Sequence, residues 1–215
     1  MNSECISNTL DFLQLIGTLK TTQRTGWVQA NVEEGFSQGQ VRVESVADHS
    51  WRMAASCIIF AGKSIPQSFN ENRNYNIEKM ISLSVFHDLA EIITGDYTPK
   101  DNISKEQKQK LEENAKKIIF NTLSQKNYSN TFNIPLDFLK NTIEQYEKKA
   151  CPESIAVKDL DILELLLQAD NYECLNRKNN LDEFFSNTKD CIKTPYVKEI
   201  IKELNKRRLI RKGLL

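Results

Sequence analysis

The stretch that decides the fold runs from Ile77 to Thr94 and reads IEKMISLSVFHDLAEIIT. Apolar residues recur on almost every face of the helix that it would form, and a helix that is apolar nearly all round is central in a fold. The same stretch contains His87, Asp88 and Glu91. Ionised side chains on a central helix need a partner, and a metal ion is one such partner. The sequence therefore predicts one helix over residues 77–94 that contributes to a metal site.

Helical periodicity extends over most of the remaining chain. Pro135 is expected to open one more helix, and the other expected helices cover residues 10–19, 45–61, 104–123, 153–175 and 195–210. The sequence contains no alternating strand pattern, repeat or clear interdomain linker. We therefore expect an all-α fold in which residues 1–215 form a single helical bundle with its core over about residues 10–205.

Residues 20–46 interrupt the helical pattern and contain three glycines. A loop of this length inside a compact domain is usually functional or disordered. It contains Arg24 and Trp27 and leads directly to His49. The sequence therefore predicts that residues 20–46 form a long loop beside the metal site.

Bulk properties exclude several classes of protein. Lys and Arg together number 29, as do Asp and Glu, so a zero net charge supplies no field to attract nucleic acid or an anionic membrane. The five cysteines are scattered and odd in number, which argues against a disulfide framework and favours a reducing compartment. The first residues lack the basic region of a signal peptide, and no apolar run approaches the ~18 residues of a membrane span. We expect a soluble cytoplasmic protein with neither nucleic acid nor membrane as a partner.

The chain has only two histidines, and each lies beside an aspartate, in Asp48-His49 and in His87-Asp88. Nitrogen and carboxylate ligands in this combination suit a divalent metal. His49 alone would be interpreted as a core histidine, and Asp48 is better explained as a helix cap. Together with the acidic residues downstream, however, the two histidines predict one metal centre.

The order of these residues resembles the HD-domain superfamily of metal-dependent phosphohydrolases, whose pattern is H…HD…D on a helical bundle. Within it the chain is similar to the HD-domain 5′-deoxynucleotidases, and the likeness covers roughly residues 10–205. The stretches that carry the resemblance include Arg24–Val28, Glu44–His49, His87–Glu91, Thr94–Asp96 and Val157–Asp161.

The resemblance implies a ligand set of His49, His87, Asp88 and Asp161. Asp159 on the same predicted helix competes with Asp161, and the Lys-x-Leu-Asp match favours Asp161. Manganese, cobalt, magnesium, iron and zinc are all compatible, because nitrogen and oxygen ligands do not fix the metal.

Glu91 and Asp96 match the second acidic pair of the family. The resemblance implies that they act as general acid or base near the leaving 5′ oxygen. A second metal, held with a backbone oxygen of Tyr97, is the alternative. The sequence leaves both roles open.

The implied reaction is hydrolysis of 2′-deoxyribonucleoside 5′-monophosphates to deoxyribonucleoside and phosphate, by a homodimer. Arg24 suits a bidentate contact to the phosphate of this small-molecule substrate. The family uses this region to hold substrate, which makes Trp27 a candidate to pack against the sugar and exclude a 2′-hydroxyl; a core or lid residue is the alternative and the commoner role of a tryptophan. The segment of residues 33–43 is longer than the family pattern leads us to expect and lies between the substrate loop and His49. Arg42, within this insertion, is therefore an alternative phosphate contact.

Two other functions stay open at the level of sequence. One is a phosphohydrolase of the same superfamily that acts on a triphosphate or a signalling nucleotide. The other is a catalytically silent helical module that binds a metal or a nucleotide. Glu91 and Asp96 argue against the silent module, since a purely structural metal site needs neither of them.

Overall fold

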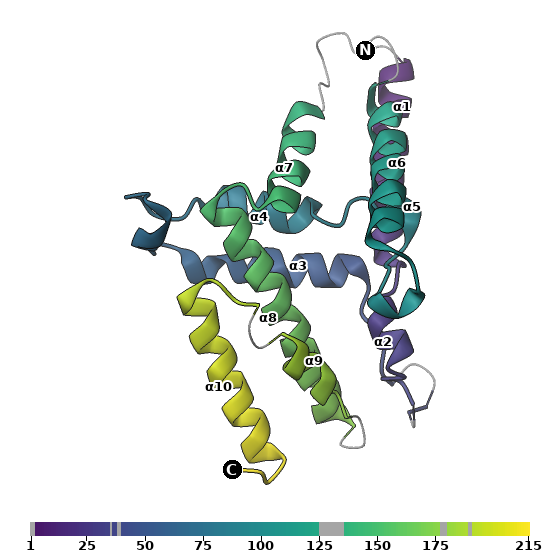
Figure 1. Ribbon diagram of the computed structural model, residues 1–215. Helices are drawn as coiled ribbons and strands as arrows, with labels where there is room; N and C mark the ends of the chain where they lie inside the picture. Colours follow the sequence, from purple (N-terminus) through teal and green to yellow (C-terminus); the bar gives the residue numbers. More distant parts are fainter. Residues whose placement is uncertain (1–2, 35, 38–39, 125–135, 177–179, 189–190) are drawn as a thin grey trace. The chain divides into compact units, whose positions relative to one another are not determined.

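A computed structural model describes residues 3–34, 36–37, 40–124, 136–176, 180–188 and 191–215, and every named element within them is a helix (Figure 1). This confirms the prediction of an all-α fold. None of the described helices combines the length and the apolar character that a membrane span needs. The helices fall into two compact units, each with its own core, and a single domain over residues 1–215 stays a prediction.

The first unit consists of residues 1–50 and 85–144. Its elements are α1 (Ser3–Gly17), η1 (Thr18–Lys20), α2 (Thr25–Gln29), the start of α3 (Val46–Ser56), α5 (Glu91–Thr94), η4 (Pro99–Asp101), α6 (Lys105–Ser124) and the first residues of α7 (Leu136–Lys148). Helix α6 packs against α1 and α5. The core of the unit consists of Phe12, Leu19, Val46, Leu89, Ile92, Ile119, Leu139 and Ile143.

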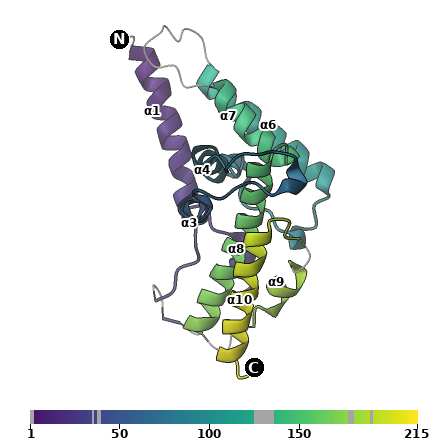
Figure 2. The same cartoon turned by 90° about the vertical axis from the view of Figure 1, so that its left-hand side faces the viewer.

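The second unit consists of residues 51–84 and 145–215. Besides the remaining parts of α3 and α7 it contains η2 (Cys57–Phe60), η3 (Gln67–Phe69), most of α4 (Ile77–Phe86), α8 (Pro152–Leu175), α9 (Asp182–Asn187) and α10 (Pro195–Arg211). Helices α8 and α10 lie side by side (Figure 2). The core includes Met53, Phe60, Met80, Leu83, Tyr146, Val157, Leu160, Leu163 and Val197.

Buried ion pairs fasten α10 to α8. Arg208 donates through Nε and Nη2 to the two oxygens of Glu173, both at 2.7 Å, and its guanidinium lies 3.9 Å from the centre of the Phe185 ring. Burial opposes ionisation of Glu173, but the hydrogen bonds from Arg208, from the Leu181 amide and from Lys212 outweigh it and hold the Glu173 pKa below its usual value. The charge of this buried acid is thus compensated within its own unit.

The prediction of one helix over residues 77–94 is wrong. Helix α4 ends at Phe86, and residues 87–90 form a turn before α5 begins at Glu91. The Leu89 amide donates to the Phe86 carbonyl at 3.2 Å and the Glu91 amide to the Asp88 carbonyl at 3.0 Å. These i→i−3 bonds wind the chain more tightly than an α-helix does. The apolar pattern of the sequence is the same for a tight turn and for a continuous helix, so it did not reveal the break.

Other boundaries also differ from the prediction. The helix expected over residues 45–61 is an α-helix only to Ser56 and then a 3₁₀ helix, η2. The expected loop over residues 20–46 contains α2, and α9 was not predicted. Pro135 and residues 35, 38 and 39 of the expected insertion lie outside the described residues.

Candidate metal centre

His49 lies in the first turns of α3, which begins with a reciprocal cap. The Asp48 carboxylate accepts hydrogen bonds from the Ser45 amide and hydroxyl, both at 2.8 Å, and the Ser45 hydroxyl accepts from the Asp48 amide at 3.1 Å. The prediction that Asp48 caps its helix is confirmed. Because the cap fixes the start of α3, it also fixes the point from which His49 projects.

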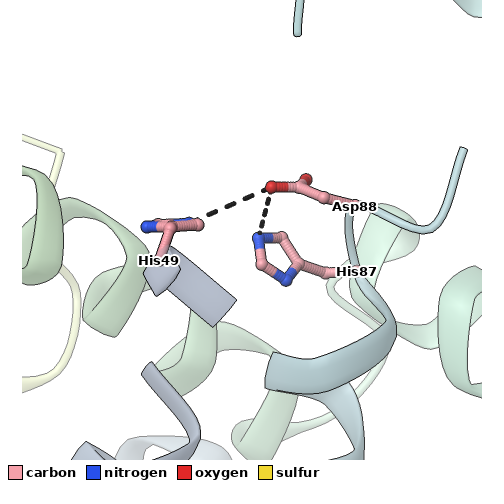
Figure 3. A group of neighbouring side chains, drawn as sticks. All are labelled: His49, His87 and Asp88. Carbon is pink, nitrogen blue, oxygen red and sulfur yellow. Dashed lines mark ion pairs between the residues drawn. The ribbon is translucent and has the colours of Figure 1, made fainter. Parts of the chain in front are cut away.

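His49, His87 and Asp88 point toward one another (Figure 3). His87 Nε2 lies 2.9 Å from Asp88 Oδ2, and His49 Nε2 lies 3.9 Å from the same oxygen. One ligand atom of each residue lies within 4.8 Å of the other two. The structure therefore brings together three of the four predicted ligands within the first unit, at a spacing that a single divalent ion can bridge.

The side chains around Asp88 favour its ionised form. Burial opposes ionisation, but His87, His49 and Arg24 outweigh it and hold the Asp88 pKa well below its usual range. Arg24 Nη1 lies 3.6 Å from Asp88 Oδ2. The structure thus places the predicted phosphate-binding arginine beside the predicted metal ligands.

Glu91 has the opposite electrostatic environment. Burial, followed by the negative charges of Asp88 and Asp96, raises the pKa of Glu91 to about 10, and Arg24 and Lys108 only partly oppose this shift. Glu91 Oε2 is buried and has no hydrogen-bond partner among the described residues. A buried carboxyl oxygen without a donor fits either a protonated acid or a carboxylate that faces a cation.

Asp96 and Tyr97, the other candidates for a second metal, contact protein donors. Asp96 Oδ2 accepts from the Thr25 amide at 2.6 Å, and the Asp96 carbonyl accepts from the Thr25 hydroxyl at 2.6 Å. The Tyr97 carbonyl accepts from Lys108 Nζ at 3.1 Å. Sequence reasoning singled out neither Thr25 nor Lys108, because nothing local marks them as neighbours of these acceptors.

Trp27 is fully buried, and its indole Nε1 donates to Glu44 Oε1 at 2.7 Å. Glu44 is itself buried and was not predicted to have a role. Trp27 therefore anchors α2 to the interior of the first unit. Its contact with the sugar of a substrate stays a prediction.

The competing aspartates Asp159 and Asp161 lie on α8 in the second unit. Asp159 is buried and accepts from the Lys193 and Thr194 amides at 3.0 and 2.5 Å, so it holds the start of α10. Asp161 Oδ2 accepts from the Tyr146 hydroxyl at 2.8 Å and from Lys158 Nζ at 2.9 Å. The structural role of Asp159 supports the preference for Asp161, whose role as a ligand stays a prediction.

Comparison with known proteins identifies the family. A family model described as HD domain matches residues 16–205. The chain belongs to the HD domain family. The chain is 35% identical to 5′-deoxynucleotidase HDDC2 of Danio rerio over 204 residues, an alignment that covers 94% of this chain and 89% of that protein. The corresponding protein of Mus musculus is 36% identical over 203 residues, which is 93% of this chain and 87% of the relative.

Solved structures contain the same HD domain fold. A conserved hypothetical protein from Pyrococcus furiosus is 27% identical and superposes with a TM-score of 0.66, over 92% of this chain and 99% of that one. The family predicted from the H…HD…D order is therefore confirmed. The donor set of two histidines and one aspartate also fits a metal-dependent HD domain.

Proposed function

We propose that this HD domain protein is a metal-dependent 5′-deoxynucleotidase, which hydrolyses 2′-deoxyribonucleoside 5′-monophosphates to deoxyribonucleoside and phosphate. The observation that carries the proposal is the cluster of His49, His87 and Asp88, whose ligand atoms lie within 4.8 Å of one another. Relatives that are named 5′-deoxynucleotidases and align with more than nine-tenths of the chain support the substrate class.

His49, His87 and Asp88 would hold the metal, and the family resemblance supports Asp161 as the fourth ligand. A divalent cation at this position supplies positive charge for the phosphoryl oxygens and lowers the pKa of a bound water. Manganese, cobalt, magnesium, iron and zinc all match the donor set.

The side chains around the metal ligands have separate proposed roles in the reaction. Arg24 offers a guanidinium fork to the phosphate, next to Asp88. Burial and the charges of Asp88 and Asp96 raise the pKa of Glu91 in the metal-free protein, and Glu91 is the proposed acid that protonates the leaving 5′ oxygen. Asp96, whose carboxylate accepts from the Thr25 amide at 2.6 Å, is the second proposed acid or base, as the family resemblance implies. In the alternative, in which Glu91, Asp96 and Tyr97 bind a second metal, the Tyr97 carbonyl would use its second lone pair, because Lys108 Nζ already donates to it at 3.1 Å.

Phosphate release from four substrates tests the function. The purified protein is assayed with Mn²⁺ or Co²⁺ on dAMP, AMP, dATP and a generic phosphate monoester. Rapid hydrolysis of dAMP with little of AMP or dATP is expected. Turnover of dATP in preference to dAMP would favour another nucleotide hydrolase of the superfamily. Retained metal with no turnover of any substrate would instead favour the silent module.

The Asp88→Ala variant tests the ligand assignment. Turnover of dAMP is expected to fall by more than about a hundredfold, because even the outer partners of metal ligands contribute ten- to a hundredfold. Bound metal, measured by elemental analysis after dialysis, is expected to fall with it. Asp11→Ala, at an exposed position of α1, is the matched control. Unchanged metal content in Asp88→Ala would show that the ligand assignment is wrong.

The family resemblance also supports a homodimer in the cytoplasm. Light scattering on the purified protein measures the oligomeric state directly. A monomer that retains full activity would contradict the proposed dimer without affecting the proposed reaction.

A further inference from the structure

The short helix α2 is held at its N-terminal end by the segment that contains Asp96. We call residues 95–101 the acidic segment. The Thr25 amide and hydroxyl donate to the Asp96 carboxylate and carbonyl, both at 2.6 Å. This pair of bonds connects the start of α2 to a proposed catalytic residue.

The C-terminal end of α2 is held by the same segment through Gln29. Gln29 Nε2 donates to Asp101 Oδ1 at 2.9 Å. The Thr98 hydroxyl lies 2.9 Å from both Gln29 Oε1 and Asp101 Oδ2, and these two acceptors share its one hydrogen. The other oxygen of Asp101 accepts from the Thr98 amide at 2.6 Å, in the cap of η4. We call Gln29, Thr98 and Asp101 the polar clamp. An amide side chain at position 29 matches it because it supplies both a donor and an acceptor.

The clamp has a charged acceptor. Hydrogen bonds from the Thr98 backbone and side chain, with a further one from Gln29, lower the pKa of Asp101. Asp101 is therefore ionised at neutral pH, and its bond with Gln29 is charge-assisted. A carboxylate at position 29 would meet this charge at hydrogen-bond distance.

Helix α2 has too few residues to be stable alone, so its position depends on contacts with the rest of the unit. Arg24 immediately precedes it and lies 3.6 Å from Asp88, while Trp27 lies in its middle and donates to Glu44. A shift of the helix end at Gln29 would therefore move the two residues assigned to the substrate. Even small misplacements of positioning groups reduce catalysis strongly.

We propose that Gln29 is a positioning residue for the substrate: its bridge to Thr98 and Asp101 fixes α2 on the acidic segment and so holds Arg24 and Trp27 in place for a deoxynucleotide. The inference rests on the proposed function, because it takes the deoxynucleoside monophosphate as the ligand of these two residues. It adds a residue that touches no substrate but determines how tightly and how selectively substrate binds.

The Gln29→Glu variant tests the proposal by placing a carboxylate against Asp101 while keeping the acceptor for Thr98. The KM for dAMP is expected to rise about tenfold and kcat to change less than about twofold, since ground-state binding is what the clamp supports. The preference for dAMP over AMP is expected to fall with it. Gln29→Ala, which introduces no repulsion, is expected to show a smaller rise in KM.

A second substitution provides a rescue. Asp101→Asn, added to Gln29→Glu, presents an amide donor to the new carboxylate while its oxygen still accepts from Thr98. The double variant is expected to return the KM to within about twofold of the original. Gln109→Glu is the matched control, because Gln109 donates to Glu113 at 3.0 Å on the exposed face of α6. A KM unchanged in Gln29→Glu, or a raised KM without rescue, would overturn the proposal.

Tryptophan fluorescence supplies a readout without substrate turnover. The chain has two tryptophans, and Trp51→Phe removes the exposed one and leaves the buried Trp27. In that background Gln29→Glu is expected to shift the Trp27 emission to longer wavelength, and the Asp101→Asn rescue to reverse the shift. Failure of the unsubstituted protein to hydrolyse dAMP would refute the proposed function. An unshifted emission would refute the clamp separately.

Discussion

Buried carboxylates of the two units have opposite environments, as Glu173 and Glu153 in the second unit and Glu91 in the first show. In the second unit, Glu173 is paired with Arg208 and the buried Glu153 with Arg73, and the pKa values of both acids are held below their usual value. In the first unit Glu91 is also buried, but its Oε2 has no donor among the described residues and its pKa is raised to about 10. Burial is therefore the same for the proposed catalytic acid and the paired acids, and the presence or absence of a compensating donor is what differs.

This difference has a physical cost. A buried carboxylate without a partner opposes folding, so a protein normally supplies an arginine or a set of amides. The second unit does so at both positions. In the first unit no described donor compensates Glu91 Oε2, so a proton or a cation has to do so. Acids with such perturbed environments cluster at functional sites. Four substitutions test this contrast and the assignment of the phosphate contact.

The largest effect is expected from Arg208→Ala in the second unit. The substitution leaves Glu173 buried without its main partner, and the free energy of unfolding is expected to fall by about 3–5 kcal/mol. Urea denaturation of the metal-free protein measures the change. Arg207→Ala is the matched control on the same helix, because the exposed Arg207–Glu203 pair is expected to contribute little. An equal fall in the free energy of unfolding in Arg208→Ala and Arg207→Ala would contradict the role of Arg208 as the compensating partner of Glu173.

A smaller effect of opposite sign is expected from Glu91→Gln in metal-free protein. Glutamate ionises near pH 4.5 when unfolded and Glu91 near pH 10 when folded, so the folded state binds the extra proton between these values. Stability is therefore lost as the pH rises from 4.5 toward 10, and Glu91→Gln removes that loss. At pH 8 the variant is expected to be more stable by about 1–3 kcal/mol, the cost of an unsatisfied buried group.

The corresponding change in the second unit provides the comparison. The folded pKa of Glu173 lies below 4.5, so its contribution is present above pH 4.5 and is lost as the pH falls through the folded value. Glu173→Gln is therefore expected to destabilise the protein at pH 8 and to flatten the acid side of the profile. A stabilised Glu173→Gln or a destabilised Glu91→Gln, measured by urea denaturation across pH, would contradict the distinction between the two acids.

The smallest effect is expected from Arg42→Ala. Arg42 Nη2 lies 2.8 Å from Asp48 Oδ2, but its side chain is 67% exposed. Such a pair is expected to contribute less than about 1 kcal/mol to stability. The KM for dAMP is expected to stay near its original value in Arg42→Ala and to rise in Arg24→Ala, since Arg24 is the arginine beside Asp88. A larger KM change at Arg42 would reassign the phosphate contact.

Much of the site could be predicted from sequence because its chemistry is rare in this chain. With only two histidines, each beside an aspartate, few other pairings were available, and the structure brings His49 and His87-Asp88 together. Helical periodicity likewise predicted the all-α fold. The choice of Asp161 over Asp159 depended on the family resemblance. The structure adds a physical reason for that choice, because Asp159 accepts hydrogen bonds from the backbone amides of Lys193 and Thr194.

The rest depended on contacts that no local pattern contains. Helix α2 was predicted as loop because its stabilising partners, Asp96 and Asp101, lie more than 70 positions away. The break at residues 87–90 was missed because a tight turn and an α-helix bury the same apolar side chains at this length. Sequence pattern also cannot show that Glu173 has an arginine partner while Glu91 Oε2 has no donor among the described residues.

Each unit is assembled from two separate stretches of chain, and this has a consequence during synthesis. The first unit can be completed once Glu144 has emerged, but residues 51–84 of the second must await residues 145–215. Met53, Phe60, Met80 and Leu83 thus leave the ribosome between 62 (145 − 83) and 92 (145 − 53) residues before the second stretch of their unit begins, which takes several seconds at about 5–20 residues per second. The nascent chain therefore exposes this apolar surface in an interval when chaperones can bind it.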